Sequence, residues 1–379
     1  QPEPALLPMT TPRLDGFHMP PEWAPHTRTW MEFPSANFTF TVDDGWLDHC
    51  RGVWASVANT IARFEPVSLV CNLGEVEIAR ALVSENVTLY ETPTGDAWCR
   101  DSGPTFLVHP DGRLGAVHWT FNGWGDRGFS DPTDEQHVGG FIAGLAGAEI
   151  FRSTMVNEGG GIHVDGDGTV LVTETVQLDT NRNPNWNGEQ VDLELKSYLG
   201  IERAIWLPRG LSRDYGTYGT NGHVDICACF VQPGLVLAHS QLDPAHPDFE
   251  VSREVLGILR GARDAKGREF EIVERPGFAP LPRAVITVTE LRRQQDRGDR
   301  VAANAAFSHY ADRDRAHNRP CDRAGAPLFR IVQPDHRRQC MAEPDARTIW
   351  RSVSAQAATG GDPAGKRAGR PSGARVEPA

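Results

Sequence analysis

Three short polar segments in the first two thirds of the chain combine carboxylates with groups that could bind a cation or move a proton. The first, residues 96–104, reads D-A-W-C-R-D-S-G-P and places Asp96 and Asp101 beside Arg100 and a Gly-Pro turn. This spacing fits a binding site, and it fits equally a salt-bridged turn in which Arg100 neutralises its neighbours. The segment alone does not decide between these two interpretations.

The second segment, residues 157–166, reads N-E-G-G-G-I-H-V-D-G and places Glu158 directly before three glycines. Because glycine has no Cβ, such a run lets the backbone pack closely or adopt positive φ. The D-G-D-G run at residues 165–168 is typical of a tight turn between two strands. We therefore predict a hairpin turn at 165–168 and a site at the glycine run, with Glu158 projecting into a cleft.

The third segment, T-N-G-H-V-D at residues 220–225, runs into the apolar stretch I-C-A-C-F. Side chains two apart in a strand share a face, so His223 and Asp225 would point the same way at the start of the predicted strand Val224–Phe230. A histidine beside a carboxylate suits general acid–base catalysis, although a structural histidine is the commoner case. A metal site would need a further His or Cys at ligand spacing, so no metal is expected.

The charge of the chain is unevenly distributed. The net charge is −12, but residues 284–379 carry 16 Arg and 1 Lys against 11 acidic residues, a net of +6, which leaves −18 for the rest. An acidic body disfavours a nucleic-acid partner and suits a cationic ligand, although acidity also serves solubility. We expect no membrane segment and no signal peptide. The seven scattered cysteines indicate a reducing cytoplasm rather than disulfides or a zinc ribbon.

Apolar patterns alternate between strand and helix along the body, which predicts an α/β fold. The alternation recurs about every 60 residues and suggests an internal repeat, with ordinary βαβ winding as the alternative. No G-x-G-x-x-G opens a helix, so a dinucleotide fold gains no support. The predicted strands are 67–70, 87–90, 115–121, 169–176, 204–206, 224–230, 234–238, 270–273 and 284–290, and the predicted helices are 75–84, 135–145, 189–199 and 250–260.

The C-terminal quarter differs from the body. Periodicity is lost after residue 290, Arg alternates with Asp, and residues 355–379 are rich in Gly, Pro, Ala and Arg. Such composition is typical of disorder. The predicted divisions are a poorly ordered extension at 1–18, a body at 19–290, an atypical region at 291–350 and a disordered tail at 351–379.

Together the three polar segments are specific. They resemble the agmatine deiminase and bacterial-type peptidylarginine deiminase family of guanidine-modifying enzymes. Further matching stretches are M-P-P-E-W-A-P-H-T-R-T-W-M (19–31), F-N-G-W-G (121–125), N-R-N-P (181–184) and W-L-P-R-G-L (206–211). The resemblance runs from about Met19 to Pro282. It implies a five-bladed α/β propeller that hydrolyses agmatine to N-carbamoylputrescine and ammonia without a cofactor. A homo-oligomer is left open.

The resemblance also implies residue roles. Asp101, Glu158 and Asp225 match the carboxylates that bind the substrate guanidinium, and His223 matches the acid–base residue. A delocalised, always-charged cation is well held by such carboxylates. Trp98 is expected to line the pocket, with core packing as the alternative.

The nucleophile is the point of departure from the family. Its members carry a C-terminal G-G-G-x-I-H-C segment, and this chain has none. Cys340 lies closest to the expected place, and Cys321 matches nothing. The sequence therefore predicts that residues from about 284 onward are a misread or diverged replacement for the final blade, and that deiminase activity is low. A protein-arginine deiminase and a non-catalytic guanidinium-binding protein are the alternatives.

Overall fold

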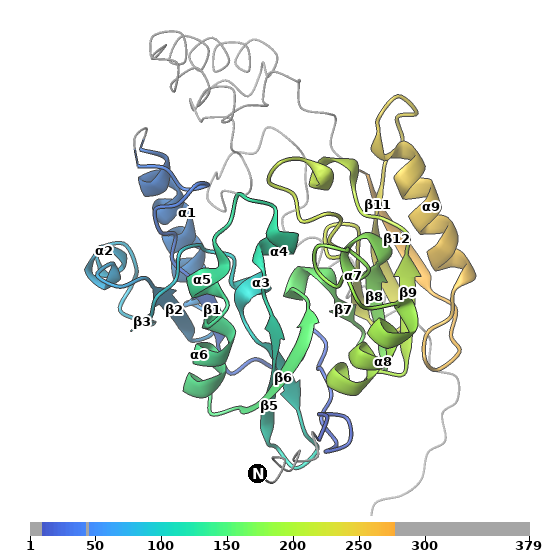
Figure 1. The fold of residues 1–379 in the computed structure, drawn as a ribbon, viewed down its shortest axis with the longest axis horizontal. Helices are drawn as coiled ribbons and strands as arrows, with labels where there is room; N and C mark the ends of the chain where they lie inside the picture. Colours follow the sequence, from blue (N-terminus) through green and yellow to red (C-terminus); the bar gives the residue numbers. More distant parts are fainter. Residues whose placement is uncertain (1–9, 43–44, 277–379) are drawn as a thin grey trace, which may run out of the picture. The chain divides into compact units, whose positions relative to one another are not determined.

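The computed structural model describes residues 10–42 and 45–276, all within one compact unit, Gln1–Leu281. Four three-stranded sheets make up this part of the chain (Figure 1). The strands are β1 (Thr29–Glu32), β2 (Val67–Cys71) and β3 (Val87–Glu91); β4 (Thr105–Val108), β5 (Leu114–Thr120) and β6 (Glu149–Val156); β7 (His163–Val164), β8 (Thr169–Thr173) and β9 (Arg203–Leu207); and β10 (Ala228–Gln232), β11 (Leu235–Ser240) and β12 (Glu271–Pro276).

Three of the four sheets repeat one order of strand pairing. In β4–β6, β7–β9 and β10–β12, the first two strands pair antiparallel and the last two pair parallel. In β1–β3 both pairs are parallel. We call each sheet with its helices a module. The alternation predicted from sequence is therefore confirmed as an α/β fold, and the repeat is visible in the topology.

Helices connect the parallel strands, as parallel pairing requires. The α-helices are α1 (Trp46–Ile61), α2 (Val76–Arg80), α3 (Cys99–Ser102), α4 (Gly123–Asp126), α5 (Pro132–Glu135), α6 (Val138–Leu145), α7 (Glu174–Gln177), α8 (Gly188–Leu199) and α9 (Asp248–Gly261), and two 3₁₀ turns are η1 (Gly159–Gly161) and η2 (Ser212–Tyr215). The central strands β2 and β8 are buried along their whole length. Burial of every residue in β2 and β8 marks strands covered on both faces.

Several predicted elements differ from those observed. The predicted strand 224–230 begins only at Ala228, and the residues before it form a turn. The predicted strand 169–176 ends at Thr173, where α7 takes over, and the predicted helix 135–145 is split into α5 and α6. The sequence did not predict β1, α1, β4 or β6. Charged and polar residues interrupt the apolar positions of β1, α1 and β6, and β4 has only three apolar residues, 106–108. The predicted boundaries near residues 290 and 350 lie outside the described residues.

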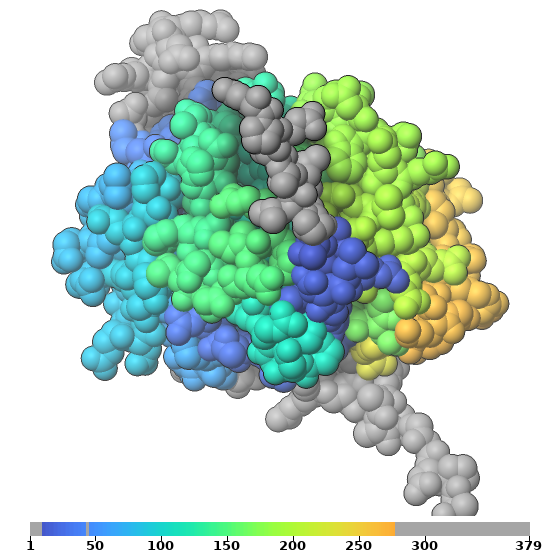
Figure 2. Space-filling model, turned by 60° about the horizontal axis from the view of Figure 1, so that its bottom comes forward, coloured from blue at the N-terminus to red at the C-terminus, as the bar shows by residue number. Residues whose placement is uncertain are grey.

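The end of the predicted N-terminal extension is packed rather than poorly ordered. Phe17 is 2% exposed within the core shared by the second and third modules. The backbone of His18 pairs with Val108 of β4, and the Met19 amide donates to the Leu199 carbonyl at 2.9 Å. Residues from Thr10 onward (dark blue in Figure 2) thus lie between two modules. Phe17 packs into the core that these modules share.

Candidate functional site

The predicted site residues lie in the segments that link one module to the next. Asp101 is in α3, just before β4, Glu158 follows β6, and His223 and Asp225 precede β10. Backbone contacts join these linkers. The Gly160 amide donates to Asp101 Oδ1 at 3.0 Å, and the Asp225 amide donates to the Gly160 carbonyl at 3.3 Å. The structure therefore brings together Asp101, Glu158, His223 and Asp225, which lie far apart in the sequence.

The glycine run makes this close approach possible. A Cβ on Gly160 would lie 2.3 Å from His223 Nδ1 and 2.9 Å from Asp101 Oδ1, and a Cβ on Gly159 would lie 2.0 Å from the Arg100 carbonyl. No side chain fits at those distances. The predicted turn at 165–168 is also confirmed, since it joins the antiparallel strands β7 and β8, with positive φ at Gly166 and Gly168. The site predicted at the glycine run, with Glu158 projecting into a cleft, stays a prediction.

The sequence suggested that His223 and Asp225 lie on a strand, but in the structure they lie in a turn before β10. Asn221 and Gly222 have φ values of 76° and 107°, which turns the chain just before His223. Asp214 of η2 holds this turn, because its carboxylate accepts the amides of Thr220, Gly222 and His223 at 2.9, 2.8 and 3.0 Å. Residues with positive φ cannot continue a strand. The role of Asp214 depends on these contacts and has no signal in the sequence.

His223 lies among carboxylates and is 4% exposed. Its Nε2 lies 3.2 Å from Glu158 Oε2, and its Nδ1 lies 3.8 Å from Asp101 Oδ1. Burial alone would lower the pKa of His223, but Asp101, Glu158 and Asp225 outweigh it and raise the pKa to about 9. The imidazole is therefore positively charged at neutral pH and can act as a proton donor.

The two aspartates differ in their surroundings. Asp101 is held in place, since its Oδ2 accepts the indole N–H of Trp124 at 2.8 Å and its Oδ1 accepts the Gly160 amide. Burial, together with the charge of Asp101, raises the pKa of Asp225 to about 6 against the opposing effect of His223. A nearby cation stabilises the ionised form of a carboxylate whose pKa is raised. The pair is thus suited to a positively charged ligand.

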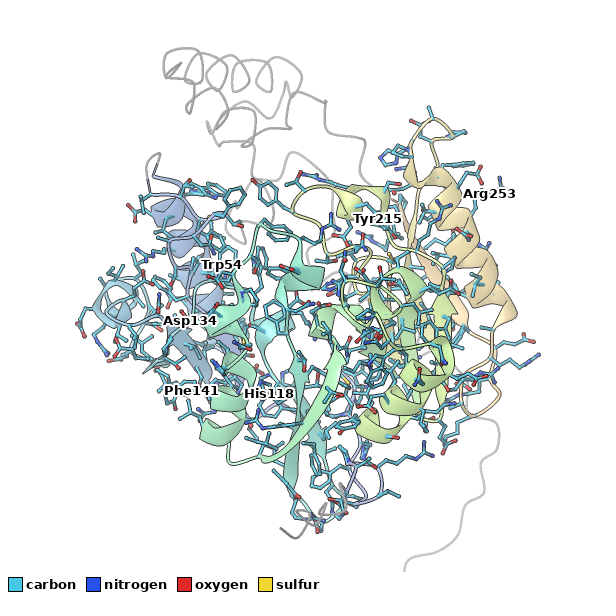
Figure 3. The ribbon with its side chains drawn as sticks, viewed as in Figure 1. Trp54, His118, Asp134, Phe141, Tyr215 and Arg253 are labelled. Carbon is cyan, nitrogen blue, oxygen red and sulfur yellow. The ribbon has the colours of Figure 1, made fainter. Side chains whose placement is uncertain are left out.

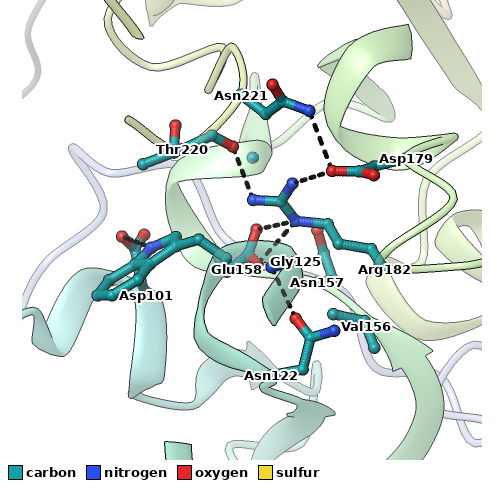
Figure 4. A network of polar contacts seen from close by, with 12 residues as sticks. Asp101, Asn122, Gly125, Val156, Asn157, Glu158, Asp179, Arg182, Thr220 and Asn221 are labelled. Atoms are coloured by element: carbon teal, nitrogen blue, oxygen red, sulfur yellow. Dashed lines mark hydrogen bonds and ion pairs between the residues drawn. The ribbon is translucent and has the colours of Figure 1, made fainter. Parts of the chain in front are cut away.

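Glu158 is engaged by groups of the protein itself (Figure 4). The Arg182 Nε lies 2.9 and 3.1 Å from its two oxygens, and His223 approaches Oε2. Burial opposes ionisation, but Arg182 and His223 outweigh it and lower the pKa of Glu158. Arg182 was quoted in sequence only as part of N-R-N-P, and its contact with Glu158 across 24 positions gave no sequence signal.

Trp98 lies in an aromatic group rather than against a carboxylate. Its ring is 42% exposed, stacks on Phe40 at 6.3 Å and meets Trp54 of α1, labelled in Figure 3, edge-on at 5.6 Å. The indole that contacts Asp101 is instead Trp124, which the sequence analysis did not single out. The pocket-lining role of Trp98 stays a prediction.

The predicted nucleophile Cys340, like Cys321, lies outside the described residues. Burial raises the pKa of Cys71 and of Cys227 to about 12, and it also raises the pKa values of Cys99 and Cys229. A thiol must lose its proton to attack carbon. These four cysteines are therefore protonated at neutral pH and unsuited to that role.

Two features are absent from residues 10–42 and 45–276. No three His, Cys, Asp or Glu side chains there are grouped as metal ligands. No helix in that part of the chain has the length and apolarity to cross a bilayer.

Comparisons with known proteins identify the family of this chain. The profile of the Porphyromonas-type peptidyl-arginine deiminase family matches residues 18–308. A relative from Streptomyces avermitilis is 53% identical over 71% of this chain and 78% of its own length, and one from Streptomyces coelicolor is 46% identical over 88% and 95%. The second match necessarily includes part of the chain after residue 282. The agmatine deiminase of Ectopseudomonas mendocina is 40% identical over 72% and 73%.

Among solved structures, the agmatine deiminase of Enterococcus faecalis superposes with a TM-score of 0.66. It is 33% identical, and the match covers 71% of this chain and 73% of that protein. Sequence profile, relatives and fold therefore agree, and the chain belongs to the Porphyromonas-type peptidyl-arginine deiminase family.

Proposed function

We propose that this chain is an amidine hydrolase that converts agmatine and water to N-carbamoylputrescine and ammonia, a step in putrescine biosynthesis. Agmatine deiminases are among its relatives and structural neighbours. The observation that carries the proposal is the charge arrangement around His223. A buried, protonated imidazole lies between Glu158 and Asp101, with Asp225 nearby.

In this proposal Asp101 and Asp225 hold the substrate guanidinium. Two carboxylates can accept its parallel N–H groups and offset its charge in a partly desolvated site. Glu158 was expected to share this task, but both of its oxygens contact Arg182, and Oε2 also contacts His223. We therefore assign Glu158 to orienting His223 rather than to binding substrate directly.

The proposed reaction proceeds in two steps. A Cys thiolate, for which Cys340 is the candidate, forms a bond to the guanidinium carbon, and ammonia leaves with a proton from His223. The neutral His223 then accepts a proton from water, whose oxygen attacks the carbon of the covalent thiouronium. Collapse breaks the C–S bond and expels the thiolate, and loss of the hydroxyl proton to solvent gives N-carbamoylputrescine. Holding carbon and thiolate together in one site lowers the entropic cost of the first step.

We also propose that the complete fold is a five-bladed α/β propeller. The four described modules come from residues 29–276, and a five-bladed propeller would draw its fifth module from the residues that follow. Cys340 belongs to that region of the sequence. We also propose a cytoplasmic location, which the free thiols of Cys71, Cys99, Cys227 and Cys229 support.

Binding and turnover should be measured separately, because they depend on different parts of the chain. Calorimetry with agmatine tests the carboxylate site, and ammonia release with detection of N-carbamoylputrescine tests hydrolysis. Release that disappears in C340S supports the full proposal, and release that persists in C340S removes Cys340 from it. Binding without release would indicate the guanidinium-binding protein, and release from peptidyl-arginine but not agmatine would indicate the protein-arginine deiminase.

A further inference from the structure

Arg182 occupies the centre of a buried polar network (Figure 4) whose members Glu158 and Thr220 contact His223. Its side chain has no exposed surface, yet each of its three nitrogens has a partner. Nε donates to Glu158 at 2.9 and 3.1 Å, Nη1 to Asp179 Oδ2 at 2.8 Å and Nη2 to the Thr220 carbonyl at 2.7 Å. A buried guanidinium is costly unless it is fully paired, and this one is.

Each of these partners is connected to His223 or to the turn before it by hydrogen bonds. Glu158 Oε2 contacts the imidazole at 3.2 Å. Thr220 accepts the His223 amide on its hydroxyl oxygen at 3.2 Å. Asp179 also accepts the Asn221 side-chain amide at 3.0 Å, at the residue where the turn before His223 begins. One guanidinium is thus linked to the ring of His223 through a carboxylate, and to its backbone through the turn.

The planar fork of an arginine is needed for this arrangement. Its nitrogens point in three fixed directions, whereas a lysine ammonium is a single point with rotatable donors. Glu158 is completely buried, and without a cation beside it nothing would compensate for the desolvation of its charged carboxylate. Lysine could supply the charge but not contact Glu158, Asp179 and the Thr220 carbonyl at once.

Arg51 shows that burial of an arginine does not by itself imply such a role. It is 6% exposed, and it pairs with Glu75 and donates to the Pro34 carbonyl at 2.9 Å. None of these partners is among the residues that contact His223 in the described part of the chain. Arg51 is therefore a matched control.

We propose that Arg182 is a positioning residue of the hydrolytic site. It fixes Glu158 and the Thr220–His223 turn, so that Nε2 of His223 meets a carboxylate while Nδ1 stays on the side of Asp101. The relevance to catalysis rests on the proposed function, but the coupling of Arg182 to Glu158 and His223 does not. The same guanidinium keeps Glu158 occupied, which leaves Asp101 and Asp225 for the cation of the substrate.

The test compares R182M, R182K and the control R51M by two measurements. Carbon NMR follows the Glu158 carboxyl through a pH titration, with E158Q to assign the signal, and calorimetry measures agmatine affinity. In R182M the midpoint of the Glu158 titration should rise by about one pH unit or more, and affinity should fall at least about tenfold, since a lost charge partner typically costs this much. R182K should lie between R182M and wild type.

R51M should melt at lower temperature but keep the wild-type Glu158 midpoint and affinity. A folded R182M with both wild-type values would overturn the proposal. If R182M does not fold, R182K decides, because wild-type values there would equally rule out a need for the arginine fork. Wild-type protein that fails to bind agmatine would contradict the proposed function, whereas the Glu158 titration would still decide the role of Arg182.

Discussion

The amide of Gly160 donates to Asp101 Oδ1 at 3.0 Å, and this contact exists because residue 160 has no side chain. The carbonyl of the same residue, Gly160, accepts the Asp225 amide. One glycine thus spaces the two aspartates that we assign to the substrate guanidinium.

Replacing Gly160 with alanine should therefore damage the site more than the fold. The new methyl would lie 2.3 Å from His223 Nδ1, so the imidazole and the Asp101 contact must shift. We expect agmatine affinity to fall at least about tenfold, the effect of losing one good charge-assisted contact. Calorimetry measures this. The control is G144A in α6, where a Cβ meets nothing within 4 Å and should stabilise the helix. Equal affinity in G160A and G144A would remove Gly160 from the site.

Agmatine binding should weaken as the pH falls below about 6. Burial raises the pKa of Asp225 to about 6, so below that value the group is neutral and must lose a proton to face a cation. Each pH unit below the midpoint should then cost about tenfold in affinity. Calorimetry between pH 5 and 8 tests this, and D225N should remove the dependence in that range. A wild-type affinity that does not change with pH would show that Asp225 does not bind the ligand.

Trp124 should contribute to binding through its indole N–H. W124F removes the donor to Asp101 Oδ2 while keeping an aromatic ring near Phe129, on which Trp124 stacks at 5.5 Å. We expect a loss of about 1 kcal/mol in agmatine binding, typical of one hydrogen bond. W119F is the control, because it removes a comparable buried bond to Thr105 at 2.9 Å. The expectation fails if both variants bind agmatine equally well.

The protein should lose stability in alkaline solution through Glu32. Glu32 and Glu135 are both buried, and the Thr94 hydroxyl lies 3.1 and 2.7 Å from them. Burial and Glu135 raise the pKa of Glu32 well above its usual value, and Ser102 of α3 donates to it at 2.6 Å. A raised folded-state pKa gives stability that is full below the unfolded value and is lost as the pH rises through the folded one.

E32Q mimics the protonated form and should melt with less dependence on pH. Thermal unfolding between pH 6 and 10 compares it with wild type and with E85Q, which changes an exposed glutamate. Parallel loss of Tm in E32Q and E85Q would show that another group causes the alkaline instability.

The sequence predicts elements best where local signals agree. Helix α8 was placed within one residue, since Asn187 and Gln190 form a capping box at its start and Gly200 ends it with φ of 66°. Strand β6 was missed because exposed Arg152 and Thr154 interrupt its apolar positions. Its place is set by pairing with β5, which no local pattern records.

The same distinction holds within the site. Asp101, Glu158, His223 and Asp225 could be proposed from sequence because each stands in a short polar segment with glycines that resembles the family. Arg182, Asp214 and Trp124 were not assigned roles, since their partners lie 24, 9 and 23 positions away and only folding brings them together. The strand predicted through His223 was wrong because Asn221 and Gly222 adopt positive φ. The contact with Asp214, which only folding brings close, holds this conformation.

The central claim is that Asp101 and Asp225 recognise a guanidinium group. Calorimetry should compare agmatine with putrescine, an alkyl diamine without a guanidinium, on wild type, D101N and D225N. The account predicts that wild type prefers agmatine at least about tenfold and that each variant loses that preference, since each charge-assisted contact is worth about 1.5–3 kcal/mol. Equal affinity of wild type for the two ligands, or an undiminished preference in both variants, would contradict it.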